Sequence, residues 1–271
     1  MDFAPAPSAT VLLLHGLCGN PLELAPLARR LREAGHRVEA PDLPGYGVPV
    51  ETAGRAPAPV PPFEQWLEQA RAHYDALAGE RPTAPPIVGG LGSGALLALG
   101  LGLQRRPGAL LLLSTCLHSD GWAVPAWQRL LPLGAVPAAL RQRLAWRERA
   151  PFGLKNEQLR AWVAQALRAT TVSPAGAART PLAALHERAR LQRYLRPHLR
   201  DVEAPALILH ARADELAGPR SVIELRRALP NSRTQWFDRS YSLLSLDQER
   251  GAVADAALGF LDELRPQRLA A

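Results

Sequence analysis

Residues 87–99, IVGGLGSGALLAL, contain the spacing with the clearest chemical meaning in the chain. An apolar run, a glycine-rich sharp turn and a small-residue helix are typical of the Gly-x-Ser-x-Gly pattern, in which the turn exposes a serine hydroxyl as a nucleophile. The outer glycines of this pattern fall on Gly90 and Gly94, so Gly92 stands where the serine would stand. We therefore predict the geometry of a nucleophile elbow without its nucleophile.

Other reactive side chains near this turn have simpler interpretations. Ser93 is adjacent, but a side chain one residue later would point along the helix, which disfavours it as a displaced nucleophile. His118 and Asp120 follow an apolar run and would reach the same region as a replacement base, although a polar start to the next segment is the simpler interpretation. Cys18 lacks a neighbouring imidazole, so it is more simply a small buried hydrophobe than a reactive thiol.

Motifs for cofactors and metals are missing from the sequence. It contains no phosphate loop and no dinucleotide fingerprint. His15 and His210 lie at the ends of apolar runs and are expected to be hydrogen-bonded structural groups. The remaining histidines lack metal-ligand spacing, and these are His36, His73, His186 and His198. We expect neither a metal nor a cofactor.

The elements that must position these residues follow from the hydrophobic pattern. Short apolar runs predict strands over residues 10–15, 36–40, 87–91, 109–114, 206–210 and 234–237. Apolar residues at helical spacing predict helices over residues 21–34, 63–77, 93–99, 222–229 and 249–264. Alternating strands and helices indicate an α/β fold, with a mostly parallel sheet flanked by helices.

Residues 118–200 break this alternation. They show helical segments, interleaved with arginine and with Trp122, Trp127 and Trp146, and no strand pattern. An insertion between two strands of such a sheet is expected over its carboxyl edge, where ligands bind. We predict a core formed by residues 1–117 and 201–271, with residues 118–200 as a helical cap inserted after the strand that ends near Ser114.

Several stretches resemble the α/β-hydrolases of the carboxylesterase and monoacylglycerol lipase type, which are serine hydrolases. Residues 15–21 read HGLCGNP, a Gly-His-x-Val stretch begins at residue 35, and residues 41–47 read PDLPGYG. Residues 210–214, HARAD, resemble the stretch that carries the acid of the triad. Residues 240–247, SYSLLSLD, resemble the Ser-Tyr-His-x-x-x-Leu-Asp stretch that carries the base. The resemblance covers most of the chain except the cap and implies the α/β-hydrolase fold.

The resemblance also implies roles for individual residues. The nucleophile position falls on Gly92, the acid on Asp214 and the base on Ser242, so two of three catalytic side chains are absent. Backbone N–H groups of Leu17 and Ser93 would form the oxyanion hole, which needs no particular side chain. The candidate residues of the pocket are His15, Cys18, His118 and Trp122.

The physics of a triad decides what this loss means. A serine attacks a carbonyl only when an imidazole takes its proton, and removing one such group costs up to about a millionfold in rate. We therefore expect a catalytically impaired pseudo-hydrolase that binds an apolar acyl or ester-like ligand, or a protein partner. Two alternatives stay open. One is an active carboxylic ester hydrolase or lyase with relocated groups, such as His118; the other is an engineered inactive form of an active serine esterase.

Charge gives weaker information about partners. The formal net charge is +7, yet Lys155 is the only lysine, and the chain is also rich in Ala, Leu, Pro and Gly. This mixture is typical of a coding bias, so we expect no nucleic-acid partner. The cap arginines, Arg141, Arg143, Arg147 and Arg149, are most simply a solvated face, with an acidic head group or an acidic carrier protein as the alternative partner.

Location is predicted from the cysteines and the first residues. Cys18 and Cys116 are too few for a disulfide framework, which favours a reducing compartment. The N-terminal residues lack the basic and apolar regions of a signal peptide, so we expect a cytoplasmic location. Residues 82–103 contain no charged residue, but their glycines and prolines favour a buried strand and helix over a membrane span.

Overall fold

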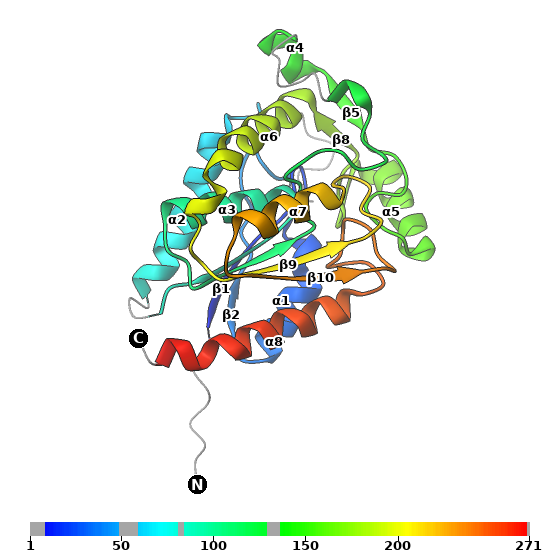
Figure 1. Ribbon diagram of the computed structural model, residues 1–271. Helices are drawn as coiled ribbons and strands as arrows, with labels where there is room; N and C mark the ends of the chain where they lie inside the picture. Colours follow the sequence, from blue (N-terminus) through cyan, green and yellow to red (C-terminus); the bar gives the residue numbers. More distant parts are fainter. Residues whose placement is uncertain (1–8, 49–58, 81–83, 129–135, 270–271) are drawn as a thin grey trace.

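The computed structural model describes residues 9–48, 59–80, 84–128 and 136–269. Its main element is a parallel sheet of six strands in the order β10-β9-β4-β3-β1-β2 (Figure 1). The strands are β1 (Thr10–Leu14), β2 (Arg37–Glu39), β3 (Ile87–Leu91), β4 (Ala109–Leu113), β9 (Ala206–Ala211) and β10 (Ser232–Phe237). The predicted α/β class and parallel sheet are confirmed.

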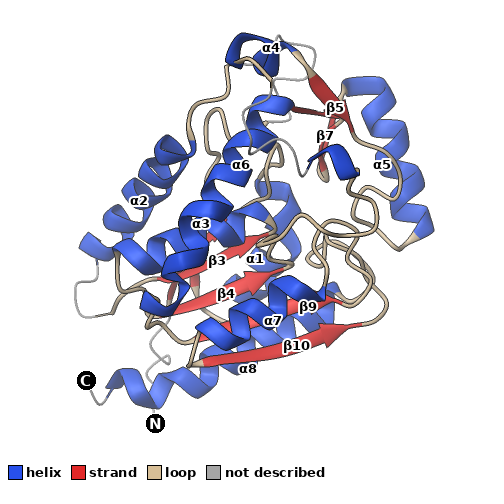
Figure 2. Ribbon diagram, turned by 45° about the horizontal axis from the view of Figure 1, so that its top comes forward, coloured by secondary structure: helices blue, strands red, loops and turns tan. Residues whose placement is uncertain are grey.

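Helices cover both faces of this sheet (Figure 2). Those of the first face and its rim are α2 (Phe63–Glu80), α3 (Ser93–Gln104), α6 (Leu182–Leu195) and α7 (Pro219–Ala228). Those of the second face are α1 (Ala25–Glu33), which follows the short helix η1 (Pro21–Leu24), and α8 (Arg250–Leu269). Each predicted core helix is present, with bounds shifted by a few residues.

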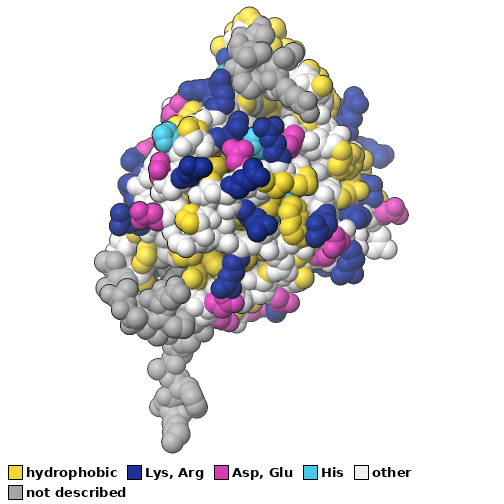
Figure 3. Space-filling model, in the orientation of Figure 1, with side chains coloured by type: hydrophobic (Ala, Val, Ile, Leu, Met, Phe, Trp, Pro, Cys, Tyr) yellow, Lys and Arg dark blue, Asp and Glu magenta, His cyan; other side chains and the backbone are white. Residues whose placement is uncertain are grey.

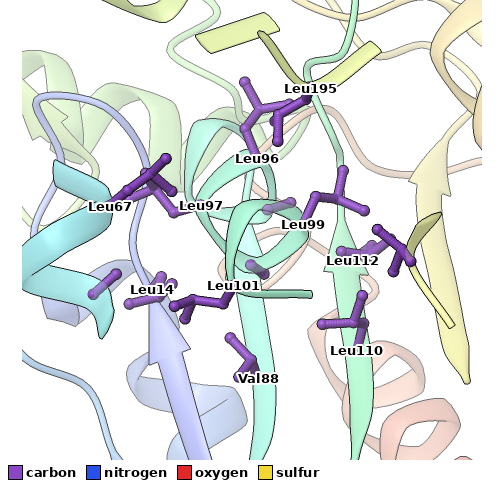
Figure 4. Close-up of a cluster of buried hydrophobic side chains, with 14 of the residues drawn as sticks. Leu14, Leu67, Val88, Leu96, Leu97, Leu99, Leu101, Leu110, Leu112 and Leu195 are labelled. Carbon is purple, nitrogen blue, oxygen red and sulfur yellow. The ribbon is translucent and has the colours of Figure 1, made fainter. Parts of the chain in front are cut away.

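Alternation of side chains along the strands produces two separate cores. Leu12 and Leu14 of β1 face α2 and α3, whereas Leu13 faces the layer of α1 and α8. Leu96, Leu97, Leu99 and Leu101 of α3 belong to the first core, and Figure 4 shows them between Leu67 of α2 and the strands. Because β3 and α3 are buried on all sides, the uncharged run that contains them is a core element. No helix in the described ranges combines the length and hydropathy needed to cross a bilayer.

The segment between β4 and β9 contains strands as well as helices. Its elements are α4 (Ala138–Arg143), β5 (Ala145–Arg147), α5 (Glu157–Thr170), β6 (Val172–Ser173), β7 (Gly176–Ala177), β8 (Arg179–Pro181), α6 and η4 (Arg196–Asp201). β5 pairs with β8 and β6 with β7, both antiparallel, which the sequence pattern did not predict. Strands of two or three residues are too short to display an alternation of apolar and polar side chains.

The two ends of this segment differ in their environment. α4 and β5 lie at the top of the molecule in Figure 1, whereas the start of α5 lies beside the start of α8, because Asn156 N–H donates to Asp247 Oδ1 at 3.0 Å. In contrast, Leu191 and Leu195 of α6 and Leu199 of η4 are buried in the first core. The cap at residues 118–200 remains a prediction as a unit, and its last helix contributes to the core beneath it.

Candidate active site

Gly92 forms the turn between β3 and α3. Its backbone angles are φ 59° and ψ −110°, in the positive-φ region that L residues adopt only under strain. Its N–H donates to the carbonyl of Leu113 at 2.8 Å, which ties the turn to the end of β4. The predicted sharp turn is therefore present, and glycine adopts it at little cost.

The three glycines of the elbow differ in the space around them. A Cβ at Gly90 would overlap the backbone of Gly94, and a Cβ at Gly94 would overlap the backbone oxygens of Leu14 and His15. A Cβ at Gly92 would have no described heavy atom within 4 Å outside its chain neighbours. The outer glycines are therefore required by close packing, whereas position 92 opens into free space.

That free space is a pocket of about 380 Å³. Five of the predicted site residues line it, namely Gly92, Ser93, Leu17, Cys18 and Ser242. Other walls come from residues 123–128 and 146–153, from the region of β7 and from α6. The structure thus brings together the elbow, the loop after β1 and the loop after β10, as the sequence predicted.

The backbone N–H groups of Leu17 and Ser93, both in the lining of this pocket, donate to no described residue. The neighbouring amides of residues 16, 18 and 19 are occupied, because they donate to Glu23, Tyr46 and Gly16 at 2.8–3.0 Å. Ser93 is the first residue of α3, where the helix itself offers no acceptor. Free backbone amides of this kind can donate to a carbonyl oxygen of a ligand.

Asp214 is buried behind the pocket and does not line it. Its Oδ1 accepts the N–H groups of Leu216 at 2.9 Å and Ala217 at 2.8 Å, which fixes the loop after β9. Its Oδ2 has no hydrogen-bond partner among the described residues. Burial raises the pKa of this carboxyl above its usual range, against the lowering effect of the two amides.

Ser242 contacts the neighbouring carboxyl, Glu215, instead of Asp214. Its Oγ donates to Glu215 Oε1 at 2.6 Å and its N–H donates to Oε2 at 3.0 Å. Glu215 is 3% exposed and lines the pocket, and burial raises its pKa. The sequence analysis missed this residue; the only signal was a second acid directly after Asp214.

Replacing this carboxyl should change how stability depends on pH. A raised pKa means that the folded state keeps a proton that the unfolded chain loses above about pH 4.3, so wild-type stability falls as pH rises from there. Glu215→Gln retains partners for Ser242 and does not titrate. The difference in free energy of unfolding between Glu215→Gln and wild type should therefore shift by roughly 1–3 kcal/mol in favour of the variant when the pH is raised from 5 to 8.

Urea unfolding at the two pH values measures this change. Glu68→Gln removes an exposed carboxylate of α2 and is the matched control, with no comparable gain. An equal difference between Glu215→Gln and wild type at both pH values would contradict the assigned shift.

Glu23 and Cys18 complete the polar wall beside the loop after β1. Glu23 is 3% exposed, its Oε2 accepts Gly16 N–H at 2.8 Å, and burial raises its pKa to about 7. Burial also raises the pKa of the Cys18 thiol to about 12. The thiol is therefore protonated at neutral pH, which makes it a poor nucleophile.

Histidine is absent from the described residues that line this pocket. His15 is fully buried against Tyr46, its Nδ1–H donates to Gly16 O at 2.9 Å, and burial lowers its pKa to about 4. His118 lines a neighbouring pocket, where its Nε2 lies 2.6 Å from Glu224. The expectation that these two imidazoles lie at the candidate pocket is not met.

Trp122 also lies outside the lining of this pocket, although Ala123 next to it is part of the wall. Its ring is 62% exposed and packs edge-on against Tyr241, and its Nε1 donates to Ala213 O at 3.1 Å. Within the described ranges, no group of three or more His, Cys, Asp or Glu residues is arranged to hold a metal ion.

Comparison with known proteins identifies the family. The Hydrolase_4 family model, described as serine aminopeptidase S33, matches residues 5–245. The chain belongs to the serine aminopeptidase S33 family. The match includes the elbow, the loop after β1 and the stretch around Ser242.

Two curated relatives of this S33 family member match nearly its whole length. A carboxylesterase of Bacillus subtilis (strain 168) is 24% identical over 256 residues, which cover 94% of this chain and 92% of the relative. A thermostable monoacylglycerol lipase of Bacillus sp. (strain H-257) is 23% identical over 255 residues, covering 92% and 89%. The resemblance inferred from the motifs is confirmed.

Solved structures establish the fold of this S33 family member. A monoacylglycerol lipase of Paleococcus ferrophilus superimposes with a TM-score of 0.72 at 18% identity, covering 96% of both chains. A monoglyceride lipase of Saccharomyces cerevisiae gives a TM-score of 0.72 at 15% identity, covering 99% of this chain and 89% of that structure. The predicted α/β-hydrolase fold is confirmed.

Proposed function

We propose that this protein binds an apolar acyl or ester-like ligand in the 380 Å³ pocket and does not hydrolyse it by serine chemistry. The carrying observation is Gly92, which occupies the strained apex of the elbow with open space before it and no hydroxyl. The free amides of Leu17 and Ser93 would hold the carbonyl oxygen of the ligand. The carboxylesterase and lipase relatives support an ester-like ligand.

The missing base supports the same proposal. Ser242 occupies the base position and hydrogen-bonds with Glu215, and a serine hydroxyl accepts no proton near neutral pH. Cys18 and Cys116 both line the pocket, and burial raises the pKa of each thiol, which disfavours a cysteine mechanism. His118 as a relocated base receives no support, because it pairs with Glu224 and does not line this pocket.

For partners and location we propose only the general class. A small apolar ligand is the partner that the pocket favours, and an acidic group on that ligand is considered below. The cytoplasmic location and the absence of a nucleic-acid partner remain predictions from composition. Both cysteines, Cys18 and Cys116, are free thiols.

Binding and turnover should separate in one experiment. With p-nitrophenyl butyrate, the wild-type chain should release nitrophenolate no more than about 10³- to 10⁴-fold faster than the uncatalysed reaction, because an oxyanion hole and binding act there without a nucleophile. An ether analogue of that ester, which cannot be hydrolysed, should nevertheless bind to the wild-type chain. Isothermal titration calorimetry measures its affinity.

A blocking variant tells whether the ligand occupies this pocket. Ala123→Trp adds bulk to the pocket wall and should abolish binding of the ether analogue, whereas Ala252→Trp on the exposed side of α8 should not. Rapid turnover by the wild-type chain, or equal binding by Ala123→Trp, would contradict the proposal.

A further inference from the structure

A second pocket lies beside the first, with a volume of about 600 Å³. It is formed by the loop after β4, by α6 and by the start of α7. Four arginines line it: Arg188, Arg193, Arg196 and Arg220. Figure 3 shows arginine side chains gathered on the face over α6 and α7. We call this cavity the arginine pocket.

Positive charge in the arginine pocket exceeds what nearby acids neutralise. Arg196 Nε lies 3.0 Å from Glu224, whose other oxygen lies 2.6 Å from His118 Nε2. Asp120, also in the lining, accepts Gly218 N–H at 2.9 Å. Arg188, Arg193 and Arg220 have no ion-pair partner within 4 Å among the described residues, and the nearest counter-charge of Arg188 is the buried carboxyl of Glu148, on its first-pocket side. Such an unneutralised cluster favours an anion.

Arg188 is the exceptional member of this cluster because it is buried. It is 9% exposed, one terminal nitrogen donates to Gln128 Oε1 at 3.3 Å, and its Nε has no partner among the described residues. A buried charged donor without an acceptor is costly, so an acceptor from a ligand would stabilise the site. Arg193 and Arg220 are exposed at the rim, which leaves them free to reach the same anion.

The arginine pocket adjoins the first pocket. Arg188, Gln128 and Leu185 line both cavities. A ligand with its apolar chain beside Leu185 would therefore place a polar end against the Arg188 guanidinium. The two cavities therefore share part of their wall.

We propose that the arginine pocket binds the phosphate group of a ligand whose apolar chain occupies the first pocket. Phosphate fits better than a carboxylate, because it offers more acceptor oxygens and up to two negative charges to three unpaired guanidinium groups. The placement of the apolar chain of the ligand rests on the proposed function. The placement of its phosphate group rests on Arg188 and its neighbours.

Calorimetric titration with octyl phosphate, 1-octanol and inorganic phosphate tests this arrangement. Octyl phosphate should bind about tenfold or more tightly than either fragment, because it alone fills both cavities. Arg188→Gln should weaken octyl phosphate binding about tenfold or more and remove its preference over 1-octanol. Arg193→Gln combined with Arg220→Gln affects only exposed residues and should weaken octyl phosphate binding severalfold, even if Arg188→Gln fails to fold.

Arg226→Gln is the matched control, because Arg226 is exposed on α7 and lines neither pocket. Equal affinity of wild type for octyl phosphate and 1-octanol would overturn the arginine pocket while leaving the apolar site intact. Tight binding of octyl phosphate and inorganic phosphate with none of 1-octanol would instead overturn the two-pocket ligand and the proposed function, and would favour free phosphate as the occupant.

Discussion

Gly92→Ser combined with Ser242→His is expected to hydrolyse p-nitrophenyl butyrate at least about 1,000-fold faster than the wild-type chain. The serine side chain would enter open space, since no described heavy atom lies within 4 Å of a Cβ at position 92. Its oxygen would then lie in the pocket that contains the free amides of Leu17 and Ser93. The strained turn costs about 1–2 kcal/mol once it carries a side chain, which a stable domain tolerates.

The histidine of this double variant would gain an orienting carboxylate. Position 242 faces Glu215 at hydrogen-bond distance, and Asp214 Oδ2 makes no hydrogen bond with a described residue, although it lies 3.8 Å from His210 Nε2. Either carboxyl can hold an imidazole with its other nitrogen toward the new serine. Because Glu215 already lies beside position 242, we expect its carboxyl, and not that of Asp214, to orient the new histidine.

Each single variant is the control for this prediction. Gly92→Ser without a base and Ser242→His without a nucleophile should both stay within about tenfold of wild type, since triad members act as a unit. Rates of nitrophenolate release measure all four proteins. A folded double variant with no gain would mean that the pocket no longer holds an ester in attack geometry.

The second large effect concerns the fold of the elbow. Gly94→Ala should destabilise the protein by about 4 kcal/mol or more, because its Cβ would overlap the carbonyl oxygens of Leu14 and His15 and force β1 away from α3. Gly92→Ala should cost only about 1–2 kcal/mol, because it introduces backbone strain without overlap.

Thermal or urea unfolding of the two alanine variants gives this comparison directly. The same substitution is made two residues apart, so the change in side-chain size is matched, and the higher helix propensity of alanine would favour only the variant at Gly94, inside α3. Equal losses of stability in Gly92→Ala and Gly94→Ala would show that the close approach of α3 to β1 is not what requires the glycine.

The elbow was predictable because its requirements are local. Gly90 and Gly94 mark a close approach of backbones, and an apolar run before them indicates a buried strand. The stretches around Asp214 and Ser242 resembled a known family closely enough to place three loops at one pocket. The order of the core strands and helices followed from the same patterns.

Buried charge was not predictable in the same way. Glu23, Glu215 and Arg188 have the composition of surface residues, and their burial depends on segments distant in the chain. Glu215 became part of the site because the loop after β10 brings Ser242 to it. The strands β5 to β8 were missed because each has too few residues to show a period.

Intact-mass measurement after treatment with a fluorophosphonate tests the central claim most directly, because this reagent adds irreversibly to an activated serine. The wild-type chain should keep its unmodified mass after prolonged exposure, and the Gly92→Ser, Ser242→His double variant should gain one adduct at position 92. Stoichiometric labelling of the wild-type chain at any serine would contradict the account of an elbow without a nucleophile.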